Sequence, residues 1–225
     1  MLDVGLMLFL FLLVPVLLEV GTRLLFYFSS FSTIKKEWLL LVDTLKITTY
    51  ASPKNAFKES INGFKLTASG RVDQHNVFLA WSKPMRDNQG KMFCKVELKN
   101  PRKVSLDLCK GVSLLKRGNM QVEDAYFQEK FKISTNNEAG MQQVLTDDIL
   151  QKIRRVFATE LEATLKIECV KNQSSNNDLI LDVGDQYFLV YSNLNYQIKN
   201  KTDRLFIERT LGAMLDIAQR IDALN

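Results

Sequence analysis

The sequence has few of the residues from which catalytic and metal sites are built. Its 225 residues include one histidine, His75, and three scattered cysteines. It has no C-x-x-C, no H-E-x-x-H, no EF-hand loop, no G-x-S-x-G elbow and no glycine-rich phosphate loop. We therefore predict no catalytic residue, no cofactor-binding residue, no metal ligand and no cofactor. An enzyme of unknown reaction stays open only as the third alternative.

The residues that interrupt regular structure, proline and glycine, are also scarce, as are cysteines that could form disulfides. Four prolines and ten glycines argue against long flexible linkers. The odd number of cysteines does not suggest a disulfide framework. Cys94 and Cys169 alternate with apolar residues, so both are expected on the buried faces of strands, in a domain that faces a reducing compartment.

The single histidine has two interpretations. Asp73 and His75 could share one face of a strand, as a base and its orienting carboxylate do. A polar hairpin turn explains the same residues more simply, and we favour it. Asp147 and Asp148 likewise look less like a catalytic pair than like the first turn of a helix, where acidic groups complement the helix dipole.

The N-terminus contains the strongest pattern in the chain. Fifteen consecutive positions, Val4 to Leu18, are apolar. Counting on to Thr22 gives nineteen residues, or about 28 Å of helix at about 1.5 Å per residue, close to a hydrocarbon core of about 30 Å. No lysine or arginine precedes the run, which argues against a cleaved signal peptide. We predict a transmembrane anchor and interfacial segment at 1–31, in a single-pass membrane protein.

Charged and aromatic residues mark the expected membrane boundary. Glu19 and Arg23 are four residues apart, so they face each other on a helix. An aromatic belt and two lysines follow, and the positive-inside rule then places the C-terminal domain in the cytoplasm. The alternative is an intramembrane charge with a function or a helix partner. The predicted boundary residues are Glu19, Arg23, Phe26, Tyr27, Phe28, Lys35 and Lys36.

Residues 32–225 have the pattern of one α+β domain. Alternating apolar and polar residues predict strands of an antiparallel sheet with one buried face. These strands are expected at 64–68, 77–81, 92–98, 104–109, 131–133, 165–170, 179–183 and 187–191, with a hairpin through Gly184 and Asp185 joining the last two. Apolar stripes predict helices at 33–45, 149–157 and 203–223, the last two capped by Thr146 and Thr202. The polar stretch at 111–124 is a candidate seam between two α/β subdomains.

A basic stretch runs from Lys83 to Arg117. It contains ten basic and three acidic residues, which gives a local charge of +7 in a chain of net charge +5. Nucleic acid is disfavoured as a partner because Phe93 is the only aromatic residue in the stretch. Anionic lipid headgroups are nearer, at about 1 kcal/mol per basic group close to the surface; a solvated sheet surface is the alternative. The candidate contacts are Lys83, Arg86, Lys91, Lys95, Lys99, Arg102 and Lys103.

A series of core positions carries a family resemblance. The series comprises Trp38, Leu41 and Leu45, then Gly63, Gly70 and Val77, then Asp124, Phe127 and Phe131, then Leu145 and Thr146, and finally residues 211–221. In this order the chain, from about residue 36 to its end, resembles bacterial membrane-anchored domains of unknown function. The resemblance implies an anchored cytoplasmic domain and no particular chemistry.

These observations favour a single-pass membrane protein whose cytoplasmic α+β domain is a non-catalytic module that binds a protein partner or the membrane surface. The alternative is a lipid-binding or small-ligand-binding domain, with a pocket between the sheet and the two apolar helices.

Overall fold

The structure is a computed structural model that describes residues 4–47, 49–51, 64–83, 90–100, 104–110, 120–157, 163–170, 185–194, 196 and 198–224. Within these ranges it describes every side chain except those of 4–12, 20, 22–31, 49–51, 64–65 and 83.

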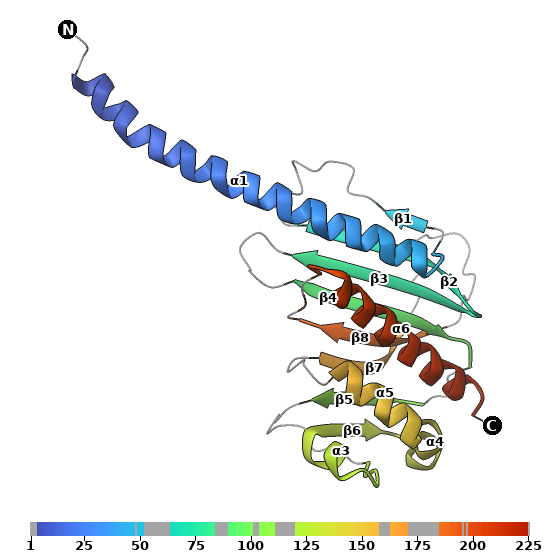
Figure 1. The fold of residues 1–225 in the computed structure, drawn as a ribbon. Helices are drawn as coiled ribbons and strands as arrows, with labels where there is room; N and C mark the ends of the chain where they lie inside the picture. Colours follow the sequence, from blue (N-terminus) through green and yellow to red (C-terminus); the bar gives the residue numbers. More distant parts are fainter. Residues whose placement is uncertain are drawn as a thin grey trace, which may run out of the picture.

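One antiparallel sheet forms the body of the domain and confirms the α+β prediction. Its eight strands lie in the order β1-β2-β3-β4-β8-β7-β5-β6, and every neighbouring pair is antiparallel (Figure 1). The strands are β1 (Thr49–Ala51), β2 (Phe64–Val72), β3 (His75–Lys83), β4 (Lys91–Leu98), β5 (Leu106–Lys110), β6 (Phe131–Thr135), β7 (Ala163–Val170) and β8 (Gln186–Asn193).

A tight hairpin joins β2 to β3, as the polar-turn interpretation predicts. Val72 pairs with His75, which leaves only Asp73 and Gln74 in the turn. Asp73 has a positive φ of 52°. Aspartate tolerates this left-handed conformation, which two-residue hairpin turns require. Asp73 is therefore a turn residue, and its side chain is exposed.

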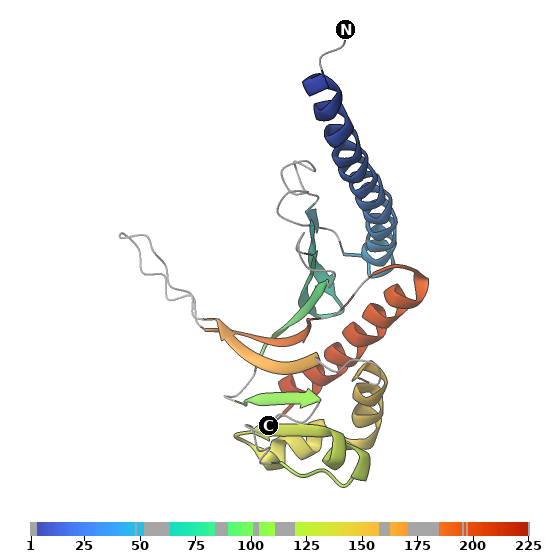
Figure 2. The same ribbon diagram turned by 90° about the vertical axis from the view of Figure 1, so that its left-hand side faces the viewer.

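The helices that the structure describes lie on one face of the sheet (Figure 2). They are α1 (Val4–Thr44), α3 (Ala125–Lys130), α4 (Glu138–Val144), α5 (Asp147–Phe157) and α6 (Lys201–Asp222). Along β4 the side chains alternate between half-buried and buried, so Met92, Cys94 and Val96 point into the core under the helices. Burial of this alternate set is what fixes the register of the strand.

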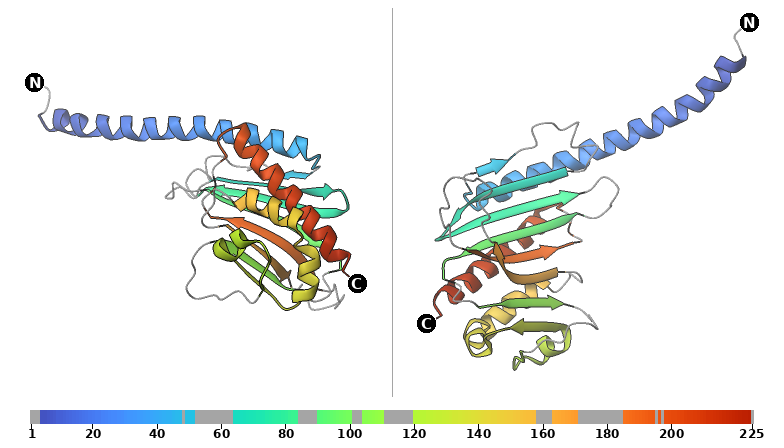
Figure 3. Two further views of the ribbon diagram at one scale, coloured as in Figure 1. Left: turned by 60° about the horizontal axis from the view of Figure 1, so that its bottom comes forward. Right: turned by 180° about the vertical axis from the view of Figure 1, so that it is seen from behind.

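The N-terminal helix is longer than the sequence analysis expected. We expected a membrane span ending near Arg23 and a separate helix at 33–45, but α1 is one uninterrupted helix of 41 residues. At about 1.5 Å per residue it is roughly 60 Å long. Its C-terminal part lies against the domain and its N-terminal part projects beyond it (Figure 3).

The last helix begins two residues earlier than predicted, and its cap is Asn200 rather than Thr202. The Asn200 side chain accepts hydrogen bonds from the backbone N–H groups of Thr202 (2.8 Å) and Asp203 (3.2 Å). The Asp203 carboxylate in turn accepts from the N–H of Asn200 at 3.1 Å, which completes a capping box.

The position of Cys169 is a further correction. Cys94 is fully buried as predicted, but Cys169 is exposed. Burial along β7 fades after Leu165, so the far end of the strand carries exposed side chains on both faces. Alternation alone could not show where along the strand this burial ends.

Two predictions concern segments outside the described residues. The expected strand at 179–183 is one of them, so its predicted hairpin with β8 is not described. The described neighbours of β8 in the sheet are β4 on one side and β7 on the other. Most of the candidate seam, 111–119, also lies outside the described residues. The strands on either side of it, β5 and β6, are direct neighbours in the single sheet. The division into two subdomains stays a prediction.

Candidate functional site

The projecting part of α1 exposes large apolar side chains. The exposed fractions are 37% for Leu13, 48% for Val14, 58% for Val16, 59% for Leu17 and 63% for Leu18. Successive helical residues are about 100° apart, so together with the exposed Pro15 these side chains surround the helix axis. A helix that is apolar all round is normally buried in protein or in lipid.

The membrane boundary is only partly visible. In the part of the chain that the structure describes, no helix is both long and apolar enough to cross a membrane. The side chains of Arg23, Phe26, Tyr27 and Phe28 lie outside the described residues, while that of Glu19 is exposed. Lys35 is half-buried and Lys36 is exposed, both on the part of α1 that lies along the domain.

The docked part of α1 is built into the core. It presents Ile34, Trp38, Leu41 and Val42 to the domain at spacings of four, three and one, and Trp38 is fully buried. This spacing gives the helix a single apolar stripe. Leu39, by contrast, is 42% exposed on the outer side of the same helix.

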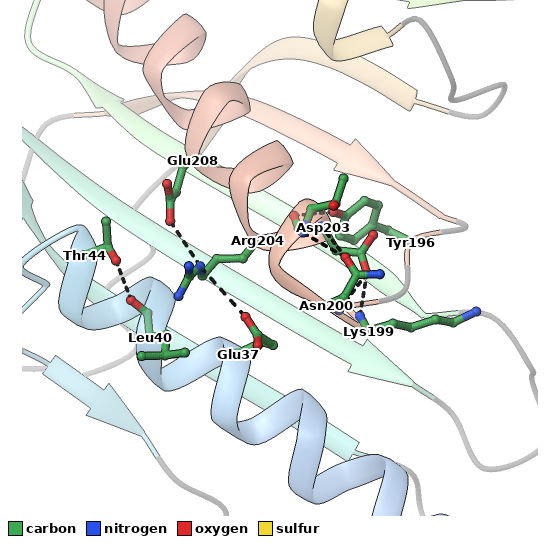
Figure 4. A network of polar contacts seen from close by, with 10 residues as sticks. Glu37, Leu40, Thr44, Tyr196, Lys199, Asn200, Asp203, Arg204 and Glu208 are labelled. Carbon is green, nitrogen blue, oxygen red and sulfur yellow. Dashed lines mark hydrogen bonds and ion pairs between the residues drawn. The ribbon is translucent and has the colours of Figure 1, made fainter.

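A polar cluster joins α1 to α6 beside this apolar stripe (Figure 4). The Arg204 Nε atom lies 3.9 Å from the Glu37 carboxylate and 3.6 Å from the Glu208 carboxylate. All three side chains are at least four-fifths buried. The distances are those of ion pairs without hydrogen bonds, and the Nε atom itself makes none. One cation between two carboxylates therefore holds the first turns of α6 against α1.

The described part of the basic stretch is spread along β4 and past its end. Lys91 and Lys95 lie on the face of β4 opposite the helices, where Lys95 is 3.7 Å from Glu168 and lies over the ring of Phe188. Lys99 follows the other end of β4, about 25 Å from Lys91 at roughly 3.3 Å per residue, and donates a hydrogen bond to Gln74. The side chains of Lys83, Arg86, Arg102 and Lys103 lie outside the described residues.

The contacts of His75 hold parts of the fold together. Its side chain is buried, and Nδ1–H donates to the backbone carbonyl of Glu97 at 3.0 Å. The Asp222 carboxylate is 3.7 Å away and accepts hydrogen bonds from the backbone N–H groups of Lys99 and Asn100. These contacts tie the end of α6 to the ends of β3 and β4. His75 also borders a surface hollow of about 470 Å³, which lies where β2, β3, β4 and β8 begin or end.

The Cys94 thiol is unsuited to the role of a nucleophile. Burial raises the pKa of Cys94 far above its ordinary value, so the thiol stays protonated. Cys94 also lies on β4 in the middle of the core, away from the His75 hairpin turn.

A groove between α5 and α6 is the second surface feature, and the sequence analysis did not predict it. Its volume is about 580 Å³. It is lined by Lys152, Arg155, Val156, Phe206, Arg209, Gly212, Ala213 and Asp216. The two helices are far apart in sequence, and their solvent-facing positions carry no periodic signal, so nothing in the chain pairs these residues.

The groove differs in position from the pocket that the alternative hypothesis requires. The space between the sheet and these helices is filled by fully buried side chains, among them Ile149, Ile153, Leu211 and Ile217. The groove opens instead on the outer side of the helical layer.

Metal binding and known relatives add nothing further. No group of three histidine, cysteine, aspartate or glutamate side chains among the described residues could hold a metal ion. No protein-family model, no curated protein and no solved structure matches this chain.

Proposed function

We propose that this protein is a single-pass membrane protein whose α+β domain is a non-catalytic interaction module held at the cytoplasmic surface. The observation that carries the proposal is the ring of exposed apolar side chains from Leu13 to Leu18 on the projecting part of α1. Water is a poor environment for this ring, and each leucine or valine favours the centre of a bilayer by about 0.3–0.6 kcal/mol.

The sequence on either side supports a span. The apolar run begins at Val4, and Pro15 inside it is tolerated in membrane helices. The predicted boundary is the Glu19 and Arg23 pair, with Phe26 to Phe28 at headgroup level. Lys35 and Lys36 then lie on the cytoplasmic side.

The continuity of α1 gives the anchor a mechanical role. The helix that would leave the membrane is the same one that contributes Trp38 to the core. From Arg23 to Glu37 it rises about 21 Å at 1.5 Å per residue. A rigid helix of this kind holds the domain at a set distance and orientation, as suits a module that meets a partner near the membrane.

Paired substitutions on the two parts of α1 test the anchor. Leu13→Arg/Leu17→Arg should release most of the full-length protein from the membrane fraction after alkaline extraction, because each arginine costs about 2.5–3.5 kcal/mol at the centre of a span. The matched control, Leu39→Arg/Leu40→Arg, alters two exposed leucines on the docked part and should stay in the membrane fraction. Equal extraction of the wild type and both variants would refute the anchor.

A reporter fused after Asn225 tests the orientation. Activity of a cytoplasmic reporter supports the proposed topology, and activity of a periplasmic or extracellular reporter overturns it. The non-catalytic role is supported by the structural bonding of His75 and the protonated, buried thiol of Cys94.

A further inference from the structure

The groove between α5 and α6 has the shape of a helix-binding site. The two helices lie side by side (Figure 1). They run antiparallel, because Asp148 near the start of α5 contacts Arg220 near the end of α6, and Lys152, one turn later in α5, contacts Asp216, one turn earlier in α6. A shallow trough between two antiparallel helices is the surface into which the ridge of a third helix packs.

The floor of the groove is formed by apolar side chains and by Gly212, which has no side chain. Val156 and Ala213 are 5% and 6% exposed, and Phe206 is half-buried beside them. Gly212 is exposed, and a Cβ atom added there would have nothing within 4 Å. The space directly above Gly212 is therefore open to a partner side chain.

The rim carries uncompensated positive charge. The positive charge of Lys152 is balanced by Asp216. Arg155 and Arg209 are exposed, and neither side chain makes a hydrogen bond or ion pair with any other described residue. The planar guanidinium of arginine suits bidentate pairing with carboxylates. Two free guanidinium groups beside an apolar floor therefore complement an occupant that is apolar on one side and acidic along its flanks.

We propose that this groove binds an acidic amphipathic helix of a partner protein. The apolar side of that helix lies on Val156, Phe206 and Ala213, and its carboxylates pair with Arg155 and Arg209. This proposal names the partner of the interaction module described under the proposed function. It rests on the proposed membrane anchor in one respect, the choice of a protein rather than a lipid as the occupant.

The choice between a protein segment and a lipid headgroup as occupant depends on the distance of the groove from the bilayer. The contact between Arg204 and Glu37 fixes the start of α6 to a point on α1 about 21 Å past Arg23. Each headgroup layer is only about 5–8 Å thick. Arg209 lies further along α6, so a protein segment suits the groove better than a lipid headgroup.

Two variants separate charge from shape. Arg155→Glu/Arg209→Glu reverses the rim, and Gly212→Leu fills the floor. Gly212→Leu should fold at least as well as the wild type, because glycine in a helix interior is about 1 kcal/mol less favourable than good helix formers. The control is Arg71→Glu/Lys201→Glu, which makes the same change of net charge at exposed positions outside the groove.

The probe is a labelled 18-residue helical peptide with leucines at i, i+3, i+4 and i+7 spacings and glutamates elsewhere. Its binding to full-length protein in neutral phosphatidylcholine nanodiscs is followed by fluorescence anisotropy. We expect saturable binding that weakens about tenfold or more in both groove variants and stays unchanged in the control. A twin peptide with lysine in place of glutamate should not bind.

Several results would overturn the proposal. They are the absence of saturable binding, equal binding of the acidic and basic peptides, and full binding by Gly212→Leu. A parallel arm measures binding of full-length protein in the same neutral nanodiscs to phosphatidylglycerol vesicles. If Arg155→Glu/Arg209→Glu abolishes vesicle binding but leaves peptide binding intact, the occupant is a lipid surface and the proposal is wrong. Alkaline extraction is scored separately, so loss of peptide binding with intact membrane attachment refutes only the groove.

Discussion

Both parts of α1 carry large apolar side chains, yet only one of them packs against the domain. In the docked part, Trp38 and Leu41 are 0% and 1% exposed against the sheet and α6. In the projecting part, Leu17 and Leu18 are 59% and 63% exposed. Backbone conformation does not separate the two parts, since both belong to one uninterrupted helix.

The distribution of polar residues does separate them. The docked part places Lys35, Lys36, Glu37 and Asp43 between its apolar positions, so it has one apolar and one polar side. The projecting part has no charged residue between Val4 and Leu18, so it has no side suited to water. A helix with one apolar stripe packs on a protein, whereas a helix that is apolar all round needs an apolar surrounding.

The largest expected effect comes from truncating the docked part. Trp38→Ala should lower the free energy of unfolding by about 3–5 kcal/mol, because it leaves a large cavity under α1. Leu17→Ala, in the projecting part, should change it by less than about 0.5 kcal/mol. Chemical denaturation of full-length protein in mild detergent, followed by circular dichroism, measures both. Similar losses in the two variants would remove the distinction between the parts.

The polar cluster at the α1–α6 junction should have a smaller effect. Arg204→Ala leaves two largely buried carboxylates, Glu37 and Glu208, without their shared cation, and should destabilise the domain by about 1–3 kcal/mol. Arg209→Ala removes an exposed arginine from the same helix and should be close to neutral. The same denaturation assay compares them, and a neutral Arg204→Ala would mean that apolar packing alone holds α1.

The cap of α6 should contribute about 1 kcal/mol. Asn200→Ala removes the acceptor for two backbone N–H groups at the start of the helix on which α1 docks. Thr202→Ala tests the cap that the sequence suggested and should have little effect. If Thr202→Ala is the more damaging change, the capping geometry described for Asn200 is wrong.

The smallest effect is expected at the other side of α6, where it meets α5. The Thr146 hydroxyl and the Arg220 guanidinium lower the pKa of Asp148 below its ordinary value. A carboxyl whose pKa is lower in the folded state adds stability above its unfolded pKa, and this is lost as the pH falls through the folded pKa. Asp148→Asn should therefore flatten the fall in stability below about pH 4. Asp147→Asn is the matched control, and an equal acid slope in the wild type and both variants would contradict this role of Asp148.

Much of the sheet was predictable because the signals are local. Alternation located the strand ending at Leu98, and the Asp73–Gln74 pair located the hairpin. The pairing of β4 with β8 was not predictable, since one-sided alternation does not say which strand lies next to which. The sequence analysis separated the segment at 1–31 from a helix at 33–45, but no glycine or proline stands at 24–32, and α1 continues through them.

The candidate site was predictable only where it is apolar. The run from Val4 to Leu18 is visible as letters in a row. Arg155 and Arg209, by contrast, are ordinary solvent-facing helix residues in the sequence. Their shared groove exists only because α5 and α6 pack side by side in the folded chain, where Lys152 contacts Asp216.

The contact between Glu37 and Arg204 also constrains how the protein is made. It joins α1 to the last helix, α6, and both helices contribute side chains to the same hydrophobic core. The ribosome therefore releases α6 long after α1 has emerged. The domain has to finish folding late, by closing a very long loop, a step that slows folding. During synthesis the apolar stripe of Ile34, Trp38 and Leu41 stays without its partner, so biogenesis is the period in which this protein is most open to aggregation.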